Sequence, residues 1–213
     1  MDGWRHLHTG GTGEIEEKKS RFIATIEPVS SEEEASAFIS EIKKKYWDAR
    51  HNCSAFVIGE KGEKTRCSDD GEPSGTAGRP MLDILTREHI TDACVVVTRY
   101  FGGTLLGTGG LVRAYSAAVA EGLKACTLIE KKHGFFAGIT CDYNDYDRIR
   151  NLAEKKGYHI AGIDYGQKVV INMIADDPGR LSADITDLTS GRAVIAKPKS
   201  ITYALDDKGQ IIE

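Results

Sequence analysis

The segment of the sequence with the clearest chemical potential is rich in glycine. Residues 102–110 (GGTLLGTGG) hold five glycines in nine positions, between an apolar run and an amphipathic run. Free N–H groups at such a helix start, with the helix dipole behind them, attract phosphate or carboxylate. The alternative is a plain turn that needs positive φ at several positions. We predict an anion or nucleic-acid backbone site formed by Gly102, Gly103, Gly107, Thr108, Gly109 and Gly110.

This segment matches neither common nucleotide-binding fingerprint. In the GxGxxG pattern, Val112 stands where the third glycine belongs after Gly107 and Gly109. In the P-loop pattern, Thr108 stands where lysine belongs. The missing lysine argues against ATP chemistry.

Basic and aromatic side chains flank the glycines. No acidic residue occurs in residues 93–120, whereas Arg99 and Arg113 lie on either side of the glycines. An arginine beside Tyr100 and Phe101 is typical of sites that stack unpaired bases and pair with phosphate. The alternative is that Arg99 pairs with a buried carboxylate of the preceding acidic loop while one ring packs in the core. We assign to the predicted anion surface Arg79, Arg99, Tyr100 and Arg113.

An acidic loop, residues 68–80 (SDDGEPSGTAGRP), precedes this region. Its carboxylates at Asp69, Asp70 and Glu72 are of the kind that holds Mg²⁺. Asp-Gly and Glu-Pro are also ordinary turn formers, so a structural loop at the rim of the cleft is the favoured interpretation. Ser74 and Thr76 lack the Gly-x-Ser-x-Gly elbow of a hydrolase nucleophile and are placed on the same rim.

Histidine and cysteine give weaker signals. His51 is predicted at the cleft rim, where it could act as an acid or base. Cys53, Cys94, Cys126 and Cys141 lie in apolar contexts typical of small core residues. No CxxC or HxxxH spacing occurs. We predict no metal site and no cofactor.

The elements that must position these residues follow from hydrophobic periodicity. In the N-terminal part, a polar opening precedes a strand at 21–26, a helix capped by Ser31 with Glu34 in a capping box, and a strand at 53–58. A short helix at 81–87, a buried strand at 94–97 and a helix with Leu111, Tyr115, Val119 and Leu123 inward come next.

The C-terminal part predicts a second unit. It has strands at 135–141, 158–163 and 168–174, a helix at 144–156 ended by Gly157, a helix opened by Pro178 and ended by Gly191, and a last strand at 193–205 interrupted by Pro198. The order β-α-β-β-α-β is that of a ferredoxin-like unit. We predict an α+β protein with domains at 1–132 and 133–213.

Composition narrows the function classes. A 40% hydrophobic and 28% charged chain is typical of a globular protein. The net charge of −4 excludes a uniformly basic nucleic-acid coat, so any RNA contact must be local. The chain offers no signal peptide and no apolar run long enough to span a bilayer. We expect a cytoplasmic protein with reduced thiols and no membrane partner.

These motifs resemble those of the IMPACT/YigZ family. The similarity rests on His51-Asn52-Cys53, the acidic loop through Gly78, and the stretch from Arg79-Pro80-Met81-Leu82 through the strand to Gly107; the C-terminal unit resembles that of the bacterial, YigZ-type members. The resemblance implies an N-terminal βαβ domain like domain IV of elongation factor G and like galactose- and mevalonate-type kinases. It implies a C-terminal domain like domain V of elongation factor G.

The resemblance also implies a biological setting. Eukaryotic relatives act in translational control by interfering with activation of a starvation-responsive initiation-factor kinase, and they carry an extra N-terminal RWD-type domain. We expect no such domain here and do not transfer that partner.

Three functions follow as hypotheses. The first is a translation-associated regulator that binds RNA, the ribosome or another phosphate-bearing partner through the glycine-rich basic surface; a protein partner in translation control is also expected, but no sequence-specific DNA binding. The second is an enzyme acting on a phosphorylated or anionic small molecule in the same cleft. The third is a protein-interaction module without an anion site.

Overall fold

The structure, a computed structural model, describes residues 4–206 and 211–212. The chain divides into a first unit, residues 1–130, and a second unit, residues 131–213. The division falls within one long strand, β8 (Thr127–Cys141). Among the described residues, no helix is both long and apolar enough to cross a membrane.

The first unit is built on a five-stranded sheet in the order β2-β3-β7-β4-β5, with every neighbouring pair antiparallel. Because β3 and β4 each pair with β7, they run parallel to each other and form a β-α-β crossover through α1 with β7 between them. The strands are β2 (Gly11–Glu17), β3 (Ser20–Pro28), β4 (His51–Ile58), β5 (Lys64–Ser68) and β7 (Ala93–Tyr100).

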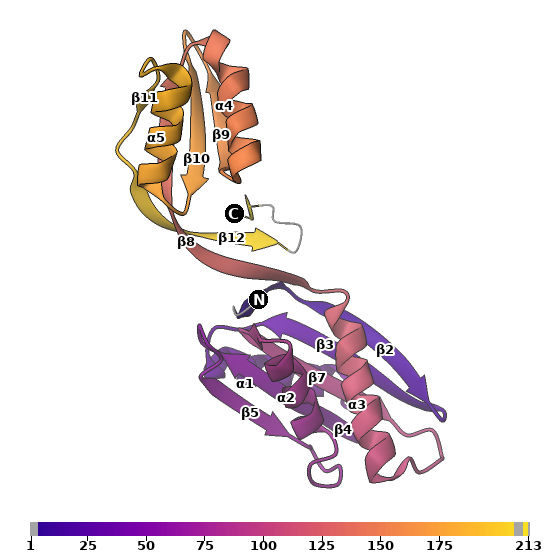
Figure 1. The fold of residues 1–213 in the computed structure, drawn as a ribbon. Helices are drawn as coiled ribbons and strands as arrows, with labels where there is room; N and C mark the ends of the chain where they lie inside the picture. Colours follow the sequence, from indigo (N-terminus) through magenta and orange to yellow (C-terminus); the bar gives the residue numbers. More distant parts are fainter. Residues whose placement is uncertain (1–3, 207–210, 213) are drawn as a thin grey trace. The chain divides into compact units, whose positions relative to one another are not determined.

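Helices cover both faces of this sheet. Figure 1 shows α2 and α3 on one face and α1 behind the other. The pleat explains this, because Val95 and Val97 of β7 pack in the core beneath α2 and α3, whereas Cys94 packs in the smaller cluster beneath α1. The bounds are α1 (Glu32–Lys45), α2 (Gly78–Arg87) and α3 (Gly107–Leu123).

The starts of α1 and α2 are fixed by local capping hydrogen bonds. The Ser31 hydroxyl accepts from the Glu34 amide at 3.1 Å, which confirms the predicted helix cap. The Glu34 carboxylate reaches Ser30 instead of closing the box on Ser31. Helix α2 begins at Gly78, three residues before the predicted start, because the end of the acidic loop caps it.

The polar opening, for which the sequence predicts no element, forms two strands. β1 (Arg5–Thr9) lies between β6 (Ile90–Thr91) and the start of β8, and β2 is an edge strand of the main sheet. A Cβ at Gly13 of β2 would collide with the backbone of Glu121 and Gly122. The glycine therefore permits α3 to approach the edge strand closely.

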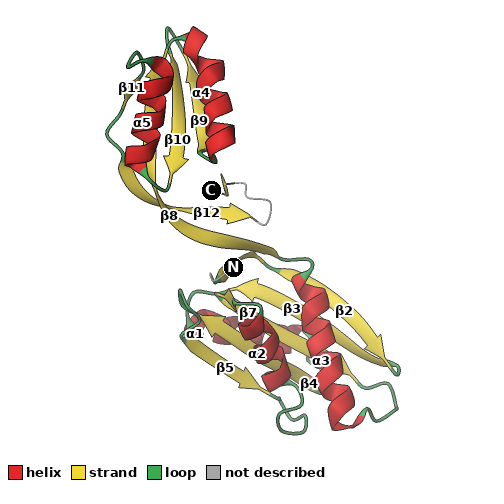
Figure 2. Ribbon diagram, viewed as in Figure 1, coloured by secondary structure: helices red, strands yellow, loops and turns green. Residues whose placement is uncertain are grey.

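The second unit has the predicted β-α-β-β-α-β order. Its sheet runs β9-β10-β8-β11, all antiparallel, and α4 and α5 lie side by side on one face (Figure 2). Further strands β12 and β13 extend the sheet from β8. The bounds are α4 (Tyr143–Lys156), β9 (His159–Tyr165), β10 (Val169–Ala175), α5 (Pro178–Thr189), β11 (Val194–Ile195), β12 (Lys199–Asp206) and β13 (Ile211–Ile212).

The helix ends of the second unit refine two predictions. Gly157 caps α4 in the left-handed conformation, at φ 74°, as predicted. Helix α5 ends with two left-handed residues, Ser190 at φ 51° and the predicted Gly191 at φ 74°, and the Gly191 amide donates to the Thr186 carbonyl oxygen at 2.9 Å. Strand β8 begins at Thr127, eight residues before the predicted strand, since its charged first half pairs with β1 instead of showing an apolar signal.

Candidate functional site

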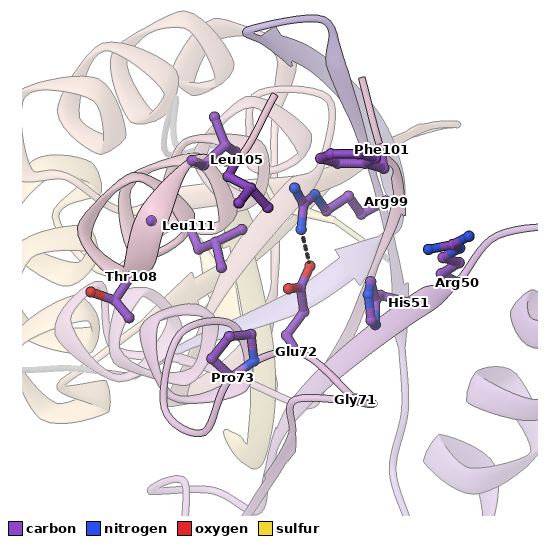
Figure 3. A pocket seen from close by; sticks show the side chains of 12 residues that line it. Arg50, His51, Gly71, Glu72, Pro73, Arg99, Phe101, Leu105, Thr108 and Leu111 are labelled. Carbon is purple, nitrogen blue, oxygen red and sulfur yellow. Dashed lines mark hydrogen bonds and ion pairs between the residues drawn. The ribbon is translucent and has the colours of Figure 1, made fainter. Parts of the chain in front are cut away.

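A cavity of about 430 Å³ lies in the first unit where β7 ends, between the acidic loop and the glycine-rich segment (Figure 3). Its apolar wall consists of Pro73, Phe101, Leu105, Leu106 and Leu111. Its polar lining consists of Arg50, His51, Glu72, Arg99 and Thr108, with backbone from Gly71 and Gly107. The volume falls within the range of small-ligand pockets.

A buried ion pair crosses this cavity wall. Arg99 Nη1 donates to Glu72 Oε1 at 2.6 Å, and only 7% and 3% of the two side chains are exposed. The pleat of β7 points Arg99 to the same face as Val97, beneath α2 and α3. Arg99 is therefore paired with a carboxylate of the acidic loop, the second of the two arrangements considered from sequence, and is not a free surface cation.

Glu72 also joins a hydrogen-bonded chain that sequence reasoning missed. The Tyr115 hydroxyl donates to the same Oε1 at 2.8 Å. The Cys53 thiol, which has one hydrogen, lies 3.3 Å from the Tyr115 hydroxyl and 2.9 Å from the Asp69 carbonyl oxygen. Burial raises the pKa of the Cys53 thiol to about 12, so it stays protonated. Tyr115 was assigned only to the helix core, because periodicity reports burial and not a hydroxyl partner.

Two polar atoms of the pair lack protein partners. Glu72 Oε2 has no hydrogen bond within residues 4–206 and 211–212, and Figure 3 shows it turned away from Arg99 toward the side where Pro73 and Leu111 lie. Arg99 Nε is buried and also unpartnered. Of the two atoms, Arg99 Nε is fully buried and Glu72 Oε2 is not, so only Oε2 is open to a ligand from the cavity.

His51 reaches the cavity from the start of β4 in a fixed orientation. Its Nδ1 donates to the Asp70 carbonyl oxygen at 2.9 Å. The Asp70 carboxylate accepts from the Asn52 amide at 2.7 Å and from Lys43 Nζ at 2.6 Å. With the proton on Nδ1, Nε2 of a neutral His51 is an acceptor.

The rest of the acidic loop is structural. The Asp69 carboxylate accepts from the amides of Gly75, Ala77 and Gly78 at 2.8, 3.0 and 2.8 Å and so caps α2. Burial opposes the charge of Asp69, but these amide bonds outweigh it and lower its pKa. The Thr76 hydroxyl donates to the Pro73 carbonyl at 2.6 Å, and Ser74 is exposed.

The three loop carboxylates do not converge on a common point. Asp69 faces α2, Asp70 faces the β4 backbone and Lys43, and Glu72 faces Arg99. Within the described part of the chain, no group of three or more His, Cys, Asp or Glu side chains is placed to hold a metal ion. The loop shapes the cavity instead.

The glycine-rich segment places the start of α3 beside the cavity. Gly103 and Gly107 have φ of +87° and +70°, which disfavours side chains, and a Cβ at Gly102 would collide with Lys19. Leu106, the N-cap residue, provides no side-chain hydrogen bond, and the first turn has no acidic residue. Gly107 and Thr108 line the cavity, while Gly109 and Gly110 lie in the first turn of the helix.

The structure separates the remaining predicted residues. Arg113 on α3 and Arg50 before β4 are exposed, with no ion pair among the described residues. Arg79 is exposed on α2, pairs with Asp83 at 2.8 Å and does not line the cavity. Tyr100 lies next to Arg99 on the strand, and its hydroxyl donates to Asp48 at 2.8 Å. Arg50 was missed, because a lone arginine before a strand carries no motif.

Comparison with known proteins relates both units to one family. Residues 18–123 match the family model described as Impact N-terminal domain, and residues 139–192 match one described as Domain of unknown function (DUF1949). The chain is 43% identical to IMPACT family member YvyE of Bacillus subtilis over 91% of this chain and 89% of that protein. It is 37% identical to YigZ of Escherichia coli over 90% of this chain and 96% of that protein.

Solved structures include similar chains. The crystal structure of a hypothetical protein, 35% identical, has a TM-score of 0.58 and covers 92% of this chain and 97% of its own. The structure of the two-domain translational regulator Yih1, 29% identical, has a TM-score of 0.38 and covers 59% of this chain and 48% of its own. The full-length similarity to YvyE and YigZ shows that the chain belongs to the IMPACT family.

Proposed function

We propose that this protein is a translation-associated regulator that binds an unpaired segment of RNA, with a phosphate at the start of α3 and a base in the adjoining cavity. The observation that carries the proposal is the cavity itself, where an acid-free helix start, an apolar wall and an unpartnered carboxylate oxygen of Glu72 meet. Each feature suits a different part of a nucleotide.

The phosphate is matched by the first turn of α3. Its N–H groups have no side-chain cap, and Gly107 and Thr108 of this turn line the cavity. Arg50, which lines the cavity, and Arg113, whose Nη1 lies 3.8 Å from where a Cβ at Gly109 would stand in the first turn, are exposed and add positive charge that no described residue neutralises. This cationic surface is narrower than the one predicted from sequence, because Arg99 and Arg79 are already paired.

The base is matched by the apolar wall. Phe101 is 50% exposed and Leu105 is 84% exposed at the cavity, although both are large and apolar. Arg99 lies 5.7 Å from the Phe101 ring centroid and supports the ring. Unpaired bases bind proteins by stacking on such rings.

The setting in translation follows from family membership. The family resemblance implies translational control for eukaryotic relatives, and the membership of this chain in the IMPACT family supports a role in translation. Binding of RNA in the cavity is compatible with that role.

The test is fluorescence anisotropy with a labelled, mixed-sequence single-stranded RNA. We expect Arg50→Ala and Arg113→Ala each to weaken binding and to lower the slope of log affinity against log salt by about one. Arg79→Ala is the matched control, an exposed arginine of the same unit that is paired with Asp83, and should bind as the unmodified protein does. Negligible binding by all four proteins at low salt would reject the proposal.

A phosphorylated small molecule is the second candidate, favoured by the fixed His51 ring with Nε2 free at the same cavity. A thermal-shift series with nucleoside monophosphates tests it. Saturation at about 100 times the dissociation constant would stabilise the fold by about 2.7 kcal/mol. Stabilisation by monophosphates without binding of RNA would favour this candidate.

A further inference from the structure

The polar wall of the cavity presents an acceptor with no protein donor. Both donors near Glu72, Arg99 Nη1 and the Tyr115 hydroxyl, use Oε1, at 2.6 and 2.8 Å. Oε2 belongs to a side chain that is 3% exposed and lines the cavity. Oε2 is not among the fully buried atoms that lack a partner, so solvent reaches it through the cavity, and a ligand that displaces this solvent has to offer a donor in its place.

The charge of the pair selects a neutral donor. Arg99 already balances the charge of Glu72, so a second cation in the cavity would meet no net negative charge. Its transfer from water into the cavity would also cost desolvation free energy. An uncharged N–H group gains the charge-assisted hydrogen bond without that cost. His51, whose Nδ1 donates to the Asp70 carbonyl oxygen, lines the same cavity.

We infer that the cavity recognises an unpaired base through its exocyclic amino group, which donates to Glu72 Oε2. This inference rests on the proposed RNA binding and specifies which bases the cavity takes. Cytosine, adenine and guanine carry such an amino group, whereas uracil presents a carbonyl oxygen in its place. An oxygen facing Oε2 would set two acceptors against each other.

Cytosine and uracil provide the sharpest test, because their rings have nearly the same shape. Short labelled oligocytidine and oligouridine are titrated against the full chain by fluorescence anisotropy. We expect oligocytidine to bind at least about five-fold more tightly, the lower limit for a good base contact. Equal binding of both oligomers would overturn the inference and leave the proposed RNA binding intact. Binding of neither would overturn both.

Glu72→Gln should reverse the preference. Arg99 Nη1 and the Tyr115 hydroxyl must both donate to an oxygen, so the glutamine amide oxygen takes the place of Oε1. The amide nitrogen then faces the cavity as a donor and suits uracil. Glu121→Gln, a half-buried glutamate on α3 that does not line the cavity, is the control and should keep the cytosine preference.

Thermal unfolding of the variant accompanies this measurement. A folded Glu72→Gln protein that still prefers oligocytidine would contradict the inference. If the variant does not fold, the comparison of the two oligomers on the unmodified protein decides the question.

Discussion

Arg99 and Glu72 show how the position of one residue decides whether its charge is a binding group or part of the fold. A surface pair contributes little to stability, whereas breaking a buried pair leaves an uncompensated charge. The pair Arg79–Asp83 is exposed and the pair Arg99–Glu72 is buried, although both have hydrogen-bonding distances below 3 Å. The two arginines therefore make a matched comparison.

We expect Arg99→Ala to lower the free energy of unfolding by about 3 to 5 kcal/mol, because Glu72 loses its counter-ion in a buried site. Arg79→Ala should cost less than about 1 kcal/mol. Urea unfolding followed by tryptophan fluorescence measures both. Similar costs for the two variants would show that Arg99 is not buried in solution.

Cysteine reactivity tests burial at single residues. Burial raises the pKa of the Cys53 and Cys94 thiols to about 12, so neither forms a thiolate near neutral pH. The pKa of the Cys67 thiol is also raised, first by partial burial and second by the negative charge of Asp69. Cys67 is nevertheless an exposed residue on β5, so a reagent can reach it.

At about pH 8 we therefore expect a thiol reagent to modify Cys67 rapidly in the folded protein and all five cysteines in denaturant. Mass spectrometry of digested protein identifies the modified residues. Cys67→Ser should remove the rapid phase. Rapid modification of Cys53 or Cys94 in the native state would contradict the structure.

At the scale of elements, Asp69 joins the acidic loop to α2. Because its pKa is lowered in the folded protein, its ionised form stabilises the fold above its unfolded pKa of about 3.9, and this stabilisation is lost as the pH falls through the folded pKa. Asp69→Ala should cost about 1 to 2 kcal/mol at neutral pH. The cost should shrink below about pH 4.

Chemical denaturation at several pH values measures this difference. Ser74→Ala, an exposed change in the same loop, should have little effect at any pH. An Asp69→Ala cost that does not depend on pH would mean that the carboxylate charge is not what caps α2.

Elements with a strong hydrophobic period were predictable from the sequence. Elements whose residue types are set by contact with a neighbouring element were not. Ser31, Gly157 and the apolar run in β7 carry their signals locally. Strand β2 carries no such local signal. Gly11 and Gly13 are needed because the end of α3 approaches them closely, and glycine is not typical of strands.

The candidate site divides in the same way. The acidic loop and the glycine-rich segment were predicted to share a cleft, and both line the cavity. The sequence could not decide between a free and a paired Arg99, because that depends on the fold of a loop 27 residues away. Tyr115 and Arg50 had no local pattern at all.

At the scale of the whole molecule, the two units have separate cores. Leu85 is fully buried in the core beneath α2 and α3, and Ile171 is fully buried in the core beneath α4 and α5. The tryptophans, Trp4 and Trp47, both lie within residues 1–130. Tryptophan fluorescence therefore reports on the first unit, whereas far-ultraviolet circular dichroism reports on both.

We expect Ile171→Ala to cost about 2 to 5 kcal/mol in the second unit, because it leaves a cavity in that core. Circular dichroism should then show an early transition, while the fluorescence midpoint stays unchanged. Leu85→Ala, an equally buried aliphatic residue of the first unit, should shift the fluorescence midpoint instead. If Ile171→Ala shifts both signals together, the units unfold as one cooperative structure, and the pairing of β8 with strands of both units is the element that would couple them.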